Sequence, residues 1–231
     1  MAVPLADQIA LGVFALAWIF YAPALALVAG GRGINADMVI IRTAWMRAMG
    51  ERDNRFLDAN LLGHLLNSGS FFASTSMLMI AAVVGALFSG DAAWRSVSSL
   101  ELLPQSSRFL FDMKLALVTI ALTRGLLDFI WAIRQLNYCL AIIGAAPPLK
   151  PEAPEVGQAF ALAASEVLGP ALSSFNSGVR GYYFALAAGA WMFGAWACMM
   201  ATLGAVALLW ARQLASPAAR GLRRIRDLLS S

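Results

Sequence analysis

Four charged side chains lie within one apolar stretch, residues 109–133, which is long enough to cross a bilayer as a single helix. They are Asp112, Lys114, Arg124 and Asp128. With about 100° of rotation per residue, Asp112, Arg124 and Asp128 fall on one half of the helix. The spacing therefore predicts a membrane helix with one charged face and one apolar face.

Arg124 lies well inside this apolar run, where an isolated charge costs between about 3 and 10 kcal/mol. Its nearest acid is Asp128, one turn later, and the other acids near apolar segments are Asp58, Asp112 and Glu166. Two interpretations remain open: a structural pair that neutralises itself, or an internal polar site for ions or a small solute. The candidate internal site consists of Arg124, Asp128, Asp58 and Asp112.

The remaining reactive residues form no catalytic or metal-binding pattern. His64 is the only histidine, so one chain cannot supply a two-histidine haem site or a histidine-rich metal centre. Cys139 and Cys198 have no partner at metal-ligand spacing and are interpreted as packing residues. We therefore expect no metal, no cofactor and no catalytic residue, and the sequence favours a protein that is not an enzyme.

The composition excludes a soluble globular domain. Of the 231 residues, 60% are hydrophobic and 13% are charged, and the mean hydropathy is +0.71. The net charge of +4 comes mostly from arginines beside the apolar segments, which suits contact with anionic lipid head groups. A nucleic-acid partner is not needed to explain these charges, and none is expected.

Hydropathy predicts an all-α integral membrane protein with one membrane domain, residues 1–231. Four transmembrane helices are expected, at about residues 9–30, 65–88, 109–133 and 182–211. Amphipathic surface helices are expected between spans one and two and between spans three and four, at about residues 36–62 and 158–175. The tail, residues 212–231, has the pattern of a basic amphipathic helix on anionic lipid.

The number of crossings is not decided by charge alone. With four crossings, the Lys and Arg residues outside the spans divide 8 to 7 between the two sides, which gives no orientation. A fifth crossing by residues 158–175 would divide them 12 to 3. Glu166 and Pro170 argue against such a crossing, so we expect four, and we leave open that this segment crosses or re-enters the membrane.

Small residues recur one turn apart in the fourth predicted span. The pairs are Ala185 and Gly189, Ala190 and Gly194, and Ala201 and Ala205. Such spacing lets helix backbones approach closely in lipid. It predicts a homo-oligomer, or packing against a partner in a membrane complex, through this helix.

Several motifs in order resemble a family of bacterial inner-membrane proteins known only as a domain of unknown function. The motifs are RDNRFLDAN (52–60), SFFAST (70–75), RQLNYC (134–139), IGAAP (143–147) and FNSGVRGYYFALA (175–187). The resemblance implies a four-span, multi-pass protein of the bacterial inner membrane and supplies no activity. It also points to a candidate surface polar cluster, which comprises Arg52, Asp53, Arg55, Asp58, Arg134, Asn137, Asn176, Arg180 and Tyr183.

Two functional hypotheses follow from these patterns. The first is a channel-like or transporter-like oligomer with an internal charged site for ions or a small solute, suggested by charges inside apolar spans. The second is a non-catalytic scaffold or accessory subunit of a larger membrane complex, suggested by small-residue packing faces and surface helices.

Overall fold

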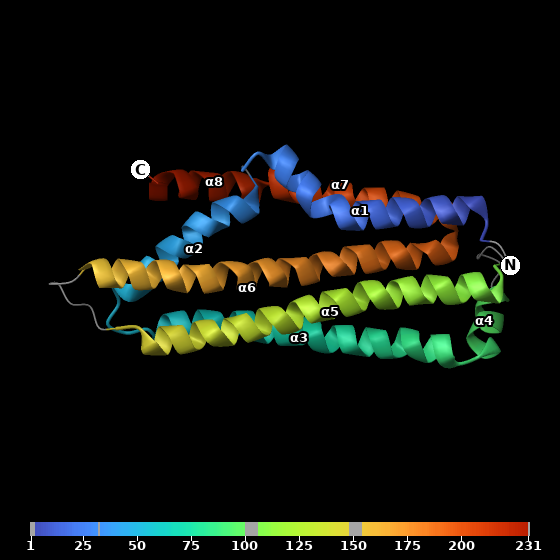
Figure 1. The fold of residues 1–231 in the computed structure, drawn as a ribbon, viewed down its shortest axis with the longest axis horizontal. Coiled ribbons are helices and arrows are strands. Elements are labelled where there is room, and N and C mark those ends of the chain that lie inside the picture. Colours follow the sequence, from blue (N-terminus) through green and yellow to red (C-terminus); the bar gives the residue numbers. More distant parts are fainter. Residues whose placement is uncertain (1–2, 32, 100–105, 148–153, 231) are drawn as a thin grey trace. The chain divides into compact units, whose positions relative to one another are not determined.

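The computed structural model describes residues 3–31, 33–99, 106–147 and 154–230 (Figure 1). It is 91% helical and has no strand among these residues, which confirms the all-α prediction. The helices are α1 (Leu5–Ala29), α2 (Ile34–Gly50), α3 (Phe56–Phe88), α4 (Asp91–Ser98), α5 (Arg108–Ala145), α6 (Pro154–Gly189), a short 3-10 helix (Ala190–Phe193), α7 (Ala195–Leu214) and α8 (Pro217–Ser230).

Four helical segments are long and apolar enough to cross a membrane. They are Leu5–Ala29, Phe56–Phe88, Arg108–Ala145 and Ala195–Leu229, the last of which contains α7. The expectation of four span-forming helices is therefore confirmed. Helix α6 does not meet the same criterion, although Figure 1 draws it as one long uninterrupted ribbon.

The predicted surface helix at residues 36–62 is divided into two parts. Helix α2 ends at Gly50, and α3 begins at Phe56. Between them, the Asn54 Oδ1 atom accepts a hydrogen bond from the backbone N–H of Phe56 at 2.9 Å, which satisfies one of the unbonded amides at the start of α3. Helical periodicity alone does not reveal this break, which falls after the helix-weakening Gly50 and before the capping asparagine.

The predicted span at residues 182–211 is not one helix. Helix α6 ends at Gly189, and a 3-10 turn leads to Gly194, whose φ of 116° is accessible to glycine and strained for other residues. Phe184 and Ala188 of α6 belong to an apolar cluster against which Ala201 of α7 packs. The two helices therefore form a hairpin. The break between them falls at a glycine, and hydropathy gives no sign of it.

The predicted surface helix at residues 158–175 is also not a separate element. It is the first half of α6, which continues through Pro170 to Gly189. A proline inside a helix removes one hydrogen bond and leaves the carbonyl four residues earlier without its usual donor. Pro170 thus weakens α6 locally without ending it.

The chain forms two compact units, and the expectation of a single membrane domain stays a prediction. Unit 1 comprises residues 1–28, 74–126 and 178–211, and unit 2 comprises residues 29–73, 127–177 and 212–231. Helices α3, α5 and α6 each contribute one part to each unit. We describe the interior of each unit by itself.

Unit 1 contains an aromatic core and one very close contact between two helices. Phe14 is fully buried and lies edge-on to Phe184, with ring centroids 5.9 Å apart. A Cβ atom on Gly181 of α6 would lie 3.0 Å from the Cα atom of Gly125 of α5. The close approach expected from small residues therefore occurs here, whereas Gly189 has nothing within 4 Å of such a Cβ.

Unit 2 has an apolar core built from four helices. Met46 and Met49 of α2, Leu62 of α3, Leu136 of α5 and Leu168 of α6 belong to one buried cluster. At the other end of the helix parts in this unit, the ring of Phe72 stacks on Phe129 at 5.4 Å. These contacts form the apolar interior of unit 2.

Candidate functional site

Asp58 is the centre of a polar cluster at the corner between α2 and α3. Its side chain has no exposed surface, and its Oδ1 atom accepts a hydrogen bond from the Trp45 indole N–H at 2.7 Å. The same oxygen pairs with the Arg52 guanidinium, whose side chain is 37% exposed. A buried carboxylate requires such partners, so this corner is held by one ion pair and one charge-assisted hydrogen bond.

Arg55 extends this corner to the end of α5. Its guanidinium donates to the carbonyl oxygen of Ala146 at 2.5 Å and to that of Pro147 at 2.7 Å. Carbonyl groups at a helix C-terminus lack intrahelical donors and carry partial negative charge. Ala146 and Pro147 directly follow the last residue of α5, so Arg55 ties the end of α5 to the start of α3.

A second buried carboxylate in unit 2 joins α2 to the C-terminal helix. Asp37 has no exposed surface, and its Oδ1 atom lies 2.8 Å from Nη1 of Arg226 in α8. On the same α2 helix, Arg42 donates to the Gly169 carbonyl of α6 at 3.4 Å. Burial lowers the pKa of the Arg42 guanidinium, which nevertheless stays protonated at neutral pH.

Unit 1 contains a buried charged cluster that joins three helices. Trp191 donates its indole N–H to the Asp7 Oδ1 atom at 2.7 Å, and Trp191 is fully buried. Lys114 of α5 is 3% exposed, and its charge interacts with that of Asp7. Asp7 lies in the first turn of α1, so this cluster brings a carboxylate and an ammonium group from two helices together inside unit 1.

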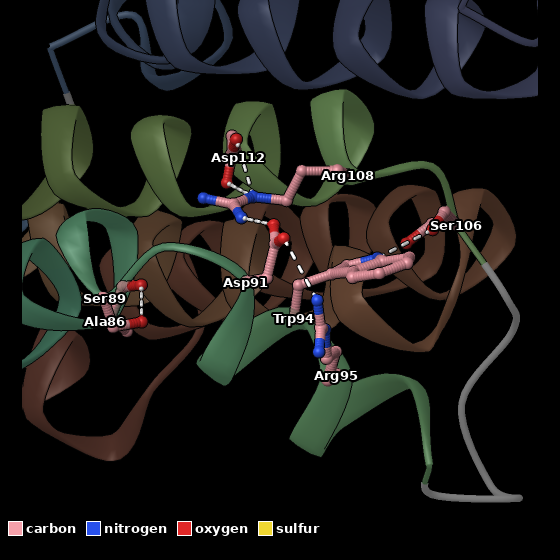
Figure 2. A network of polar contacts seen from close by, with 8 residues as sticks. All are labelled: Ala86, Ser89, Asp91, Trp94, Arg95, Ser106, Arg108 and Asp112. Atoms are coloured by element: carbon pink, nitrogen blue, oxygen red, sulfur yellow. Dashed lines mark hydrogen bonds and ion pairs between the residues drawn. The ribbon is translucent and has the colours of Figure 1, made fainter.

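A more exposed network of polar contacts joins α4 to α5 in unit 1 (Figure 2). Arg108 donates to both carboxylate oxygens of Asp112, at 2.9 and 3.0 Å, and pairs with Asp91 at 2.5 Å. Trp94 donates its indole N–H to the Ser106 carbonyl at 3.1 Å. Because these ion pairs are partly solvated, they contribute little to stability.

An apolar groove lies between α1 and α5 in unit 1, with a volume of about 480 Å³. Seven apolar side chains and one charged side chain line it: Leu11, Phe14, Ala15, Trp18, Ile19, Leu117, Ile120 and Arg124. Arg124 is exposed at the surface of unit 1. The groove thus combines a hydrocarbon-like wall with a single guanidinium.

The carboxylates of the candidate internal site make separate contacts. Asp128 belongs to unit 2 and accepts a hydrogen bond from Ser177 at 2.8 Å. Asp112 pairs with Arg108, and Asp58 pairs with Arg52. Each of these three acids therefore has a partner near it in sequence or on a neighbouring helix, and the grouping around Arg124 stays a prediction.

The residues of the candidate surface cluster also make separate contacts. Arg52, Arg55 and Asp58 meet at the α2–α3 corner, where Asp53 is exposed. The other members make these contacts: Arg134 donates to the Tyr138 hydroxyl at 2.7 Å, Asn137 donates to the Ile133 carbonyl at 3.0 Å, Asn176 donates to Asn35 at 3.5 Å, and Arg180 lies 5.0 Å from the Tyr21 ring centroid. Tyr183 is half-buried in unit 1.

Sequence reasoning missed Asp7, Asp37 and their partners. Asp7 and Trp191 are 184 residues apart, and Asp37 and Arg226 are 189 apart, so no local spacing relates them. The sequence did contain a signal for Lys114, because a charge inside an apolar span needs an acid from the same helix bundle to compensate it. That argument was applied to Arg124 alone.

The described residues contain no group of three His, Cys, Asp or Glu side chains that could hold a metal ion. A family model described as a protein of unknown function, DUF599, matches residues 9–218. The chain belongs to the DUF599 family. This membership confirms the resemblance drawn from the motifs, and the family description carries no activity to this DUF599 member. No curated protein and no solved structure matches the chain.

Proposed function

We propose that this DUF599 protein is a multi-pass protein of the bacterial plasma membrane that acts as a non-catalytic scaffold or accessory subunit. In this proposal, unit 1 lies in the bilayer and unit 2 is a helical module in the cytoplasm. The observation that carries it is the division of charge: unit 2 holds 21 of the 30 charged residues and unit 1 holds 9. Charges are costly in lipid and favourable in water.

The sign of the charge supports the cytoplasmic side for unit 2. It contains 12 of the 17 Lys and Arg residues, and unit 1 contains the other five, Arg95, Arg108, Lys114, Arg124 and Arg180. Cytoplasmic segments near membrane spans carry an excess of Lys and Arg. The same 12 Lys and Arg residues lie on the inner side in the count for five crossings, which leaves out Lys114 and Arg124 because they lie within a predicted span.

The order of the chain supports a fifth crossing by α6. The chain passes from one unit to the other after residues 28, 73, 126, 177 and 211. If unit 1 lies in the bilayer, α5 leads out of it and α7 begins inside it, so the chain must return in between. In this proposal α6 (Pro154–Gly189), whose residues from 178 onward belong to unit 1, provides that return.

The polar contacts favour a structural role over transport. In unit 2 the buried acids Asp58 and Asp37 pair with arginines, and in unit 1 Asp7 interacts with Lys114. These pairs tie helices together, and the groove beside Arg124 is lined mainly by apolar side chains.

Helix α8 adds an exposed face with Ile225, Leu228, Leu229, Arg220 and Arg224, which suits an anionic lipid surface.

Purification in mild detergent, after crosslinking in intact cells, tests the scaffold role. We expect a second protein, or a second copy of this chain, at a fixed ratio through every column. Charge reversal at the exposed Arg47 of unit 2 is expected to lower that ratio, whereas Arg95→Glu in α4 of unit 1 is the control and is expected to leave it unchanged. Recovery of this chain alone and as a monomer would contradict the proposal.

A further inference from the structure

The groove between α1 and α5 has the composition of a lipid site. Both helices are long and apolar enough to cross a membrane, so with unit 1 in the bilayer, as proposed above, the groove meets hydrocarbon rather than water. Its wall includes Trp18 and the exposed side chains Ile19 and Ile120. An acyl chain fills such a groove without leaving a polar group unpaired.

Arg124 lies at one end of the groove. The buried cluster around Phe14 includes Leu117, and Trp18, one turn further along α1, packs with Ala121, one turn further along α5. The two helices therefore run in the same direction, and Arg124 lies beside the Ile19 end. From residue 11 to residue 19, at about 1.5 Å per residue, the groove is about 12 Å long, close to the depth of one leaflet of about 15 Å.

We infer that the groove binds one phospholipid with an anionic head group, its acyl chain along α1 and α5 and its phosphate on Arg124. A guanidinium carries five N–H donors in a fork that matches phosphate oxygens, so it can bind a head group alongside the contacts that it makes within the protein. The charge complementarity selects an anionic lipid, and the apolar wall selects a lipid over a free phosphate. This inference concerns unit 1 and does not depend on the scaffold role.

Trp18 provides a direct readout, because bromine atoms on an acyl chain quench an indole only at short range. The full chain is reconstituted into vesicles of phosphatidylcholine that contain equal mole fractions of either brominated phosphatidylglycerol or brominated phosphatidylcholine. The protein has seven tryptophans, so the Trp18 signal is the difference between the wild type and Trp18→Phe. We expect brominated phosphatidylglycerol to quench this signal at about fivefold lower mole fraction, the selectivity that one basic side chain gives near a membrane surface.

Two pairs of variants separate the head group from the acyl chain. Arg124→Gln is expected to abolish the preference, whereas Arg95→Gln, at a 73% exposed arginine of unit 1, is expected to retain it. Ala15→Phe fills the groove and is expected to reduce quenching by both lipids, and Ala22→Phe, on the exposed surface of α1, is its control. Equal quenching by the two lipids in the wild type, a preference that survives Arg124→Gln, or no quenching of Trp18 by either lipid would overturn the inference.

Discussion

Replacement of Asp58 by alanine is expected to lower the thermal midpoint of the detergent-solubilised protein by about 5–15 °C. The change removes the acceptor of the Trp45 indole N–H and the partner of Arg52 at a fully buried position. Loss of one member of a buried pair costs about 3–5 kcal/mol. Because the Arg52 side chain is 37% exposed and can turn to water, we expect about 2–4 kcal/mol.

Two further substitutions make the Asp58 experiment specific. Asp58→Asn keeps an oxygen acceptor for Trp45 and removes only the charge, so a smaller loss is expected. Asp53→Ala changes an exposed acid at the same corner and is expected to alter stability by less than about 0.5 kcal/mol. Equal midpoints for the wild type and Asp58→Ala would show that the ion pair does not hold the corner.

The second large effect is expected at Gly181, where α6 meets α5. An alanine Cβ would lie 3.0 Å from the Gly125 Cα atom and 3.7 Å from the Ala121 carbonyl oxygen, so the two helices must move apart. Overpacking of this kind costs about 1–3 kcal/mol. We expect Gly181→Ala to lower the thermal midpoint, and Gly181→Val to lower it further.

Gly204 of α7 is the matched control for the Gly181 variants. It is a helical glycine of the same unit, and a Cβ atom at this position would have nothing within 4 Å. Gly204→Ala is expected to be neutral or to stabilise α7 by up to about 1 kcal/mol, because alanine favours a helix more than glycine does. If both alanine variants unfold at the same temperature as the wild type, the contact between α5 and α6 is looser than described.

The long helices could be predicted from the sequence because hydropathy over about 20 residues is a local property. The apolar runs at residues 9–30, 65–88 and 109–133 lie within or nearly within α1, α3 and α5. The helix ends were less predictable. Residues 182–211 form one apolar run, so the break at Gly194 depends on backbone conformation rather than on hydropathy.

The polar clusters were only partly predictable. The family motif brought Arg52, Arg55 and Asp58 together, and the structure groups these three at one corner. The pairing of Asp37 with Arg226 joins helices at opposite ends of the sequence, and only the fold relates them. The surroundings of Arg124 likewise depend on how α1 packs beside α5, and its role stays a prediction.

The proposed topology places unit 1 in the bilayer and requires α6 to cross it. Labelling of single cysteines with a membrane-impermeant maleimide tests this claim, in a background where the buried Cys139 and Cys198 are replaced by alanine. Ser96→Cys in α4 and Asn54→Cys at the α2–α3 corner are the reference positions, because both residues are exposed and they belong to different units.

The decisive position is Phe193, which is 65% exposed in the turn between α6 and α7. If α6 crosses the bilayer, Phe193→Cys reacts from outside the cell together with Ser96→Cys, and Asn54→Cys reacts only after the membrane is permeabilised. A Phe193→Cys protein that is unreactive from both sides, as expected for the middle of one span at residues 182–211, or that reacts only together with Asn54→Cys, would contradict the account.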